Sequence, residues 1–299
     1  MIYAIISDIH GNKFAFEAVL ADAVACGAEK FLLIGDYTNS FPWGNEVAER
    51  IRTLRNATVV RGNGEGYLEN LRQRDPVTFV DQQFKPVYWA YQSLSAENLA
   101  YMTTLLETAI VDEKINLQHA MDIFHHESRR EWFSSFRFRH DLSREEYLKS
   151  AREFLLTDEN AMAQIRSLDE GVYLFGHNHV QFFAAVEGRL FINPGSCGEP
   201  LDGDTRASYT LLLGEGTNWR VEERRVVYDR EAVRDAIVSS GYAKYTPVWS
   251  HIMMQELDTA QDHFYKFVVN LTETAQKLGV PSTHDKAWEA ACAKYFTNM

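Results

Sequence analysis

Three short segments in the first 63 residues are apolar on both faces, and a helical pattern separates each from the next. They cover residues 2–7, 31–34 and 57–60. A strand with one face in water shows polar residues at every second position, and these segments do not. We therefore predict parallel strands in strand-helix-strand units, with helices or a second sheet covering both faces of each strand.

The rest of the chain predicts more strands, an insertion and a helical end. A helix is expected over residues 95–105, a hairpin over 109–111 and 115–118, and further strands over 172–175, 182–186, 190–192, 209–213 and 219–227. The charged, aromatic-rich residues 120–170 contain helical patterns at 143–155 and 159–168, which indicate a helical insertion. Residues 229–299 predict a helical C-terminal extension packed on the same domain.

Charge and cysteine content narrow the classes of function. The chain has 42 acidic and 30 basic residues and a net charge of −12, which argues against a nucleic-acid groove. Cys26, Cys197 and Cys292 are odd in number and widely spaced, as in proteins of a reducing cytoplasm. No apolar stretch approaches the roughly 18 residues of a membrane helix, and the first residues predict a strand rather than a signal peptide. We expect a cytoplasmic protein that does not bind a membrane.

Residue types that bind metals follow the predicted strands directly. They are Asp8, His10, Asp36, Asn63, His119, His177 and His179. In an extended chain, residues two apart project to the same side, so Asp8 and His10 should point together, as should His177 and His179. All seven converge if their strands are neighbours with the carboxyl ends together. Imidazole combined with hard oxygen ligands suits first-row divalent metals.

Each of these features alone is more often structural. An Asp-x-His pair is usually a cap or a surface pair, Gly-Asp is usually a turn, and a single histidine at a strand end usually only forms hydrogen bonds. Five such elements occur here in order, each directly after an apolar strand. That coincidence favours a metal site.

The order of these elements resembles the calcineurin-like metallophosphoesterase superfamily. The matching motifs are Asp8-x-His10, Gly35-Asp36, Gly62-Asn63, His119 and Gly176-His177-x-His179. The loop that begins Asn193-Pro194-Gly195-Ser196 is similar to that of the bacterial and archaeal branch of small phosphodiesterases. The resemblance implies an α/β (α+β) fold, a four-layer sandwich of two mixed sheets flanked by helices. It assigns residues 1–228 to the metallophosphoesterase domain, with the insertion inside it.

The same resemblance implies a ligand set. One metal would be held by Asp8, His10, Asp36 and His179, and the second by Asp36, Asn63, His119 and His177, so that Asp36 bridges them. The implied cofactors are two divalent ions, manganese first, with iron, zinc or cobalt as alternatives. Two such ions, two aspartates and a bridging hydroxide leave a net charge of about +1, which attracts a phosphate that the acidic surface would repel. Asp36, Asn63 and His119 are then the catalytic residues, and the hydroxide attacks phosphorus in line.

Departures from the family pattern bear on the substrate. Many members have a proton-donating histidine where this chain has Gly64, and Ala120 stands where the family usually has glycine. The Asp-Arg pair of the Ser/Thr phosphatases is absent, which disfavours a protein phosphatase. Arg61, His125 and His126 are expected to contact substrate, although exposed basic runs are usually solvated surface.

The sequence therefore predicts a dinuclear metal-dependent phosphoesterase that hydrolyses small phosphodiester or nucleotide-like substrates. The first alternative is a metal-binding interaction scaffold of the same fold with weak turnover, and retention of all seven ligands argues against it. The second is a nuclease, which the acidic balance disfavours. A homo-oligomer remains open.

Overall fold

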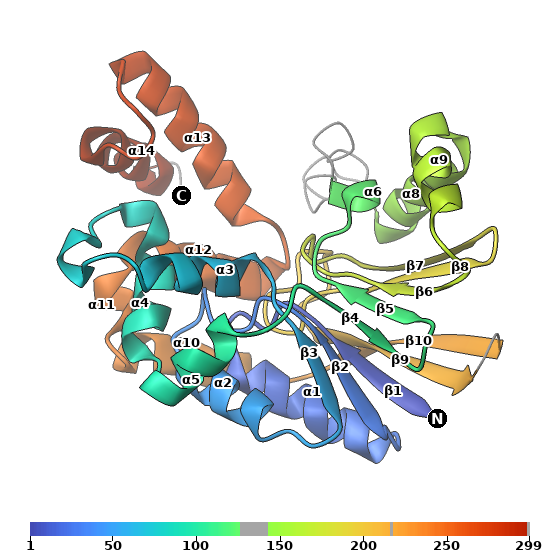
Figure 1. Ribbon diagram of the computed structural model, residues 1–299. Helices are drawn as coiled ribbons and strands as arrows, with labels where there is room; N and C mark the ends of the chain where they lie inside the picture. Colours follow the sequence, from blue (N-terminus) through green and yellow to red (C-terminus); the bar gives the residue numbers. More distant parts are fainter. Residues whose placement is uncertain (126–142, 216–217, 298–299) are drawn as a thin grey trace.

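The computed structural model describes residues 1–125, 143–215 and 218–297, and Figure 1 shows two facing sheets with helices outside them. The first sheet has the order β10-β9-β1-β2-β3 and the second β4-β5-β6-β8-β7. The strands are β1 Ile2–Ile6, β2 Lys30–Ile34, β3 Ala57–Val60, β4 Thr108–Val111, β5 Ile115–Gln118, β6 Gly171–Leu174, β7 Gln181–Val186, β8 Arg189–Pro194, β9 Ala207–Glu215 and β10 Asn218–Val226. The predicted pair of mixed sheets is confirmed.

The helices fall into three groups along the chain. The first group is α1 Lys13–Ala25, α2 Gly44–Arg52, α3 Asn63–Leu71, α4 Lys85–Ser93 and α5 Ala96–Thr103, with 3-10 turns at Pro76–Thr78 and Gln82–Phe84. The insertion contains α6 Asp122–His125, α8 Arg144–Thr157 and α9 Glu159–Ser167. The C-terminal helices are α10 Arg230–Ser239, α11 Tyr242–Tyr245, α12 Pro247–Thr259, α13 His263–Leu278 and α14 Asp285–Thr297. None of the described helices is both long enough and apolar enough to span a bilayer.

Strand direction brings the functional loops to one end of the sandwich. Strands β1, β2 and β3 run parallel, and so do β5, β6 and β8 in the other sheet. Antiparallel strands lie outside these sets: β9 pairs with β1, β4 with β5, and β7 with β8. Parallel neighbours end at the same edge of a sheet, so the loops after β1, β2 and β3 meet there.

Side chains of β1 explain why the strand is apolar on both faces. Tyr3 and Ile5 pack in a core between the two sheets, whereas Ala4 and Ile6 belong to a second core under the flanking helices. Alternate residues of a strand point to opposite faces, so both sets must be apolar when both faces are covered. A third core joins the second sheet to the insertion, where the rings of Phe124 and Phe175 stack 4.1 Å apart.

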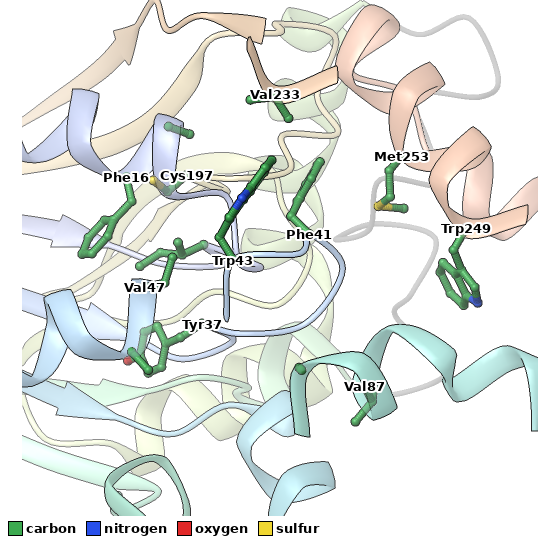
Figure 2. Close-up of a cluster of buried hydrophobic side chains, with 14 of the residues drawn as sticks. Phe16, Tyr37, Phe41, Trp43, Val47, Val87, Cys197, Val233, Trp249 and Met253 are labelled. Atoms are coloured by element: carbon green, nitrogen blue, oxygen red, sulfur yellow. The ribbon is translucent and has the colours of Figure 1, made fainter. Parts of the chain in front are cut away.

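The C-terminal helices pack on the same core as α1 and α2. Figure 2 shows Val233 of α10 and Met253 of α12 in one hydrophobic cluster with Phe41 and Val47. Hydrogen bonds add to this packing, among them one of 3.1 Å from Trp249 Nε1 to the Gln82 carbonyl. The helices after residue 229 thus pack on the same core as the predicted domain of residues 1–228, and the boundary between domain and extension stays a prediction.

The apolar rhythm across residues 249–278 continues through a turn. It spans two helices, because Ala260 adopts a left-handed conformation (φ 48°) and Asp262 caps α13 by accepting from the Tyr265 N–H. In the insertion, α8 and α9 match the helical patterns, and α8 begins with the capping box of Ser143 and Glu146. Residues 126–142 lie outside the described part of the chain.

Candidate metal centre

Five of the seven predicted ligands have a left-handed backbone. The φ angles are 52° at Asp8, 53° at His10, 55° at Asp36, 74° at His177 and 57° at His179. Residues other than glycine rarely adopt this conformation, and each costs about 1–3 kcal/mol, so the surrounding fold must hold them there. The expectation that each Asp-x-His or His-x-His pair lies in extended chain is therefore wrong, because these residues already belong to tight loops.

The first group of side chains consists of Asp8, His10 and His179, all buried. The Nε2 atoms of His10 and His179 lie 3.0 Å apart, and Asp8 Oδ1 lies 3.3 Å from His179 Nε2 and 3.8 Å from His10 Nε2. Their donor atoms all lie within 4.8 Å of one another. Three ligand atoms from two loops thus face one small volume.

The second group consists of Asp36, His119 and the exposed His177, joined by Asn63. His119 Nε2 lies 3.4 Å from Asp36 Oδ2 and 3.2 Å from Asn63 Oδ1. His177 Nδ1 lies 2.9 Å from the same amide oxygen. His177 and His179 thus belong to different groups. The family resemblance implies this separation, whereas an extended strand would point both side chains to the same side.

Two glycines of the motifs let the aspartates approach neighbouring loops. A Cβ at Gly62 would lie 2.3 Å from Asp36 Oδ1, and one at Gly176 would lie 2.6 Å from Asp8 Oδ2. Real Cβ contacts are not this short, so a side chain at either position would displace a carboxylate. Glycine is therefore needed before Asn63 and before His177, because the carboxylates of Asp36 and Asp8 lie against these two positions.

Hydrogen bonds to the far ring nitrogens orient the histidines. His119 Nδ1–H donates to the Ile34 carbonyl (2.6 Å), and His179 Nδ1–H donates to the Glu199 carbonyl (2.7 Å). Each bond fixes the tautomer and turns the Nε2 lone pair toward the aspartates, which is how metal-binding histidines are usually held. The loop after β8 also supports the site, since Ser196 Oγ donates to the Asp8 carbonyl at 2.7 Å.

Opposite charges in the centre shift several pKa values. Burial raises the pKa of Asp8 and of Asp36, but the charge and hydrogen bonds of His179 and His119 respectively outweigh it, and both carboxyls end below their usual range. Burial lowers the pKa of the two imidazoles, but Asp36 raises that of His119 to about 10 and Asp8 raises that of His179 to about 9. The carboxylates need positive charge beside them, which protons or divalent ions can supply.

The donor set fits divalent metals. Asp8 Oδ1 is buried and has no hydrogen-bond partner among the described residues. Asn63 Oδ1 and Asp36 Oδ2 both face the lone-pair side of His119, an arrangement of acceptors that a cation satisfies. Mixed imidazole and oxygen ligands are those of manganese, iron, zinc or cobalt rather than of calcium.

Glu65 is a site residue that the sequence analysis did not identify. Its buried carboxylate accepts hydrogen bonds from the backbone N–H groups of Gly62 (2.9 Å), Asp36 (3.0 Å) and Tyr37 (2.9 Å). It therefore ties the loop that carries Asp36 to the start of α3, which carries Asn63. A capping-box glutamate three residues after Gly62 was the available signal.

The three residues expected to contact substrate fall in different places. Arg61 pairs with Glu69 and Glu107, both at 2.6 Å, and lines an open hollow beside His119 and His177. His125 is the last residue of α6, and its side chain lies outside the described structure, as does all of His126. Their role in binding substrate stays a prediction.

A second cavity, of about 330 Å³, is also lined by residues of the two groups. It is lined by His10, Asp36, Asn39, Ser40, Asn63, Tyr67, Gln83, Phe84, Pro86, Val87, His177, Asn178, His179, Glu199, Leu201, Trp249, Met253, Glu256, Asp262 and Phe264. The histidines and carboxylates of the centre thus line a space large enough for a small organic ligand.

Comparison with known proteins agrees with the geometry. A crystal structure of a metallophosphoesterase from Sphaerobacter thermophilus matches with a TM-score of 0.62 and 25% identity, covering 87% of this chain and all of that one. A hypothetical protein from Pyrococcus horikoshii shares the fold, with a TM-score of 0.58 and 17% identity over 83% of this chain and 97% of that one. An uncharacterised protein of Methanocaldococcus jannaschii is 27% identical over 254 residues, or 79% of this chain and 92% of that protein.

A family model gives the decisive match. The model of the calcineurin-like phosphoesterase superfamily domain covers residues 1–216, which include strands β1 to β9 and all seven residues of the two ligand groups. The described strands also form the two mixed sheets expected of that family. The chain therefore belongs to the calcineurin-like phosphoesterase superfamily.

Proposed function

We propose that the protein is a dinuclear metal-dependent phosphoesterase that hydrolyses small phosphodiester or nucleotide-like substrates. The observation that carries the proposal is the convergence of two ligand groups, Asp8 with His10 and His179, and Asp36 with His119 and His177. Asp36 lies between them in the proposed assignment and would be shared. Two divalent ions held there would supply positive charge to a phosphate and make a water molecule acidic enough to attack it.

The chain's own residues prepare the site for that chemistry. Asn63 brings an amide oxygen to within 3.2 Å of His119 and 2.9 Å of His177, so it links the two histidines of the second group. Glu65 fixes the Asp36 loop through its backbone N–H groups. Because these groups are held before a ligand arrives, little reorganisation is needed on binding.

Two hollows flank the ligand groups, which favours a diester over a monoester. One is the cavity of about 330 Å³ that reaches α12, and the other is the open hollow lined by Arg61 and Gln118. A phosphodiester carries a substituent on each side of phosphorus, and each would find space. A monoester would use only one of the two.

A turnover panel tests the proposal. The protein is treated with a chelator, reloaded with manganese, iron, zinc, cobalt or magnesium in turn, and assayed on 4-nitrophenyl mono- and diesters and cyclic nucleotides. We expect diester hydrolysis that requires metal, with manganese most effective. The double variant Asp8→Asn and Asp36→Asn is the control that should abolish it. Absence of metal-dependent turnover on every ester would favour the interaction scaffold.

The proposal extends to the location of the protein in the cell. Three scattered cysteines and an acidic surface favour a cytoplasmic enzyme that acts on small molecules rather than on nucleic acid. Cys197 is buried beside the metal loops, and burial raises the pKa of its thiol, so it serves packing rather than catalysis.

A further inference from the structure

The cavity of about 330 Å³ joins the metal-ligand groups to the C-terminal helices. Its inner end is formed by ligands such as His10 and His179, and its outer end by Trp249 and Glu256 of α12 and by Phe264 of α13. A phosphoester with its phosphate at the ligand groups would therefore place an organic substituent against α12 and α13. Residues 249–264 lie beyond the segment that the family model matches, so this end of the cavity is specific to this chain and those that share the extension.

Aromatic rings form much of that outer end. Trp249 and Phe264 stack with ring centres 4.4 Å apart, and Trp249 is fixed by its hydrogen bond to the Gln82 carbonyl. Tyr67 and Phe84 form a second aromatic pair, edge to face at 6.1 Å. Phe264 is 37% exposed, so part of its ring remains accessible. Such surfaces bind a planar ring well.

Carboxyl groups accompany the rings. Glu199 and Glu256 are buried and hydrogen-bonded to each other, and Asp262 lines the same cavity at the start of α13. Glu256 Oε1 also accepts from the Phe264 N–H at 2.8 Å. Aromatic rings beside a carboxylate such as that of Asp262 attract organic cations and N–H donors, and the carboxylate repels anions.

We propose that this cavity binds the organic substituent of the substrate and prefers a planar ring with positive charge or N–H donors to one with a second negative charge. The inference rests on the proposed function, because the phosphate must lie at the ligand groups. It narrows the substrate class to esters whose substituent is an amino-bearing ring. Esters that would direct a further phosphate toward α12 and α13 bind poorly.

Three matched inhibitors test the preference for charge. Phenylphosphonate, its 4-aminomethyl derivative and its 4-carboxy derivative share an anionic anchor and an aromatic ring and differ in the charge at the far end. Each competes against hydrolysis of bis(4-nitrophenyl) phosphate by the manganese-loaded full chain. We expect the aminomethyl compound to bind tightest and the carboxy compound weakest, with about fivefold between neighbours.

The variant Asp262→Asn removes the negative charge of Asp262 and keeps its helix cap. Asp262 Oδ1 accepts from the Tyr265 N–H at 2.7 Å, and asparagine caps a helix as well as aspartate, so only the charge is lost. The matched control is Asp229→Asn, the same change at the N-cap of α10, which does not line the cavity. Asp262→Asn should reduce the ratio between the aminomethyl and carboxy compounds, and the control should leave it unchanged.

The variant Phe264→Leu tests the aromatic wall of the cavity, which Trp249 and Phe264 form. Leucine keeps the apolar bulk but loses the stacked ring, so all three inhibitors should weaken by a similar factor of about three to ten. Methylphosphonate, which has no ring, should bind this variant and the unmodified protein equally. A variant that binds all four compounds as the unmodified protein does would exclude the wall from the binding site.

The outcomes separate this inference from the proposed function. Metal-dependent hydrolysis combined with equal or reversed binding of the two charged inhibitors would overturn the inference and leave the proposed function intact. So would an equal change of the ratio in Asp262→Asn and Asp229→Asn. Absence of metal-dependent hydrolysis would overturn the proposed function, and the inference with it.

Discussion

In the proposed assignment, Asp36 is the residue that the two ligand groups share. Its Oδ2 atom lies 3.4 Å from His119 Nε2, and its Oδ1 atom accepts from the Gly64 N–H at 2.7 Å. Asparagine keeps the shape and an acceptor oxygen but removes the negative charge. Asp36→Asn should therefore lower bound metal and activity together, the latter by at least about 100-fold.

Metal analysis of the purified variant measures this loss directly. The control is Asp112→Asn, which removes a partly exposed carboxylate that pairs with Lys30 at the start of β2, the end of the strand away from Asp36. Two tightly held ions per chain in Asp36→Asn would contradict a shared role for this aspartate.

In the proposed reaction, Gly64 leaves the departing alcohol without a proton donor at this position. General acid catalysis contributes typically 10²–10⁴ in rate, and glycine cannot donate a proton. We expect rates to fall steeply as the pKa of the leaving alcohol rises, so that aryl esters react much faster than alkyl esters. A series of methyl aryl phosphodiesters measures the slope. A flat slope would show that another group of the protein donates the proton.

Restoring the acid needs two changes. A Cβ at position 64 would lie 2.5 Å from Asn39 Oδ1 and 3.1 Å from Asp36 Oδ1, so the amide of Asn39 occupies the space that a larger side chain requires. Gly64→His combined with Asn39→Ala should flatten the slope more than Gly64→His alone. Equal slopes in the two variants would mean that Asn39 does not restrict this position.

At the level of single residues, the sequence predicted which side chains converge better than it predicted their backbone geometry. Seven candidate ligands at strand ends could be recognised because the end of an apolar strand shows where a loop begins. The left-handed backbone of Asp8 and His179 could not be recognised, since it results from contacts with distant loops such as the bond from Gly198 N–H to the Asp8 carbonyl. The role of Glu65 could not be predicted, because a capping glutamate is common at helix starts that have no part in a functional site.

Among the elements, α12 brings a buried carboxyl into the cavity. Burial, followed by the charges of Glu199 and Asp262, raises the pKa of Glu256 well above its usual range, and Tyr295 also faces it. A carboxyl that holds its proton more tightly in the folded state loses stability as pH rises above its unfolded pKa. The folded protein should therefore be penalised at neutral and alkaline pH, and not near pH 4.

Glu256→Gln removes this penalty and keeps an oxygen for the Phe264 N–H. We expect the melting temperature to rise by roughly 2–6 °C at pH 8 and to change little at pH 4. Glu231→Gln on α10, an exposed site, serves as the control and should do neither. A lower melting temperature of Glu256→Gln at pH 8 would show that the ionised carboxylate stabilises the fold.

The strands were easier to predict than the arrangement of the helices. Ala57–Val60 and Ile115–Gln118 were placed to the residue because turn residues and charged residues bound their apolar runs. The apolar rhythm of α12 and α13 does not show where one helix ends and the next begins, because the turn at Ala260 depends on a hydrogen bond from Gly203 N–H to the Ala260 carbonyl. Such a contact between residues far apart in sequence leaves no local pattern.

For the molecule as a whole, metal should act as a stabilising ligand. The centre gathers two buried aspartates and three buried histidines from both sheets, so ions bound there would hold the halves of the sandwich together. At a metal concentration 100 times Kd, binding adds about 2.7 kcal/mol. For a domain of this size the melting temperature should rise by roughly 5–10 °C.

Thermal melts with a chelator and with increasing manganese measure the effect. The rise should be lost in Asp36→Asn, whose melting temperature without metal supplies the baseline. A melting temperature that does not depend on manganese in the unmodified protein would mean that the ligand groups do not bind the ion in the folded state.

The hydrogen bond between Gly203 and Ala260 has an evolutionary consequence. The metal loops and the wall of the cavity come from opposite ends of the chain, and this contact joins them where α12 turns into α13. New substrate preferences can therefore arise by exchange or divergence of the last seventy residues while the hydrolytic machinery is inherited unchanged. Lineages that carry the same metal loops with different C-terminal helices would be expected to differ in the molecules they consume rather than in the bond they break.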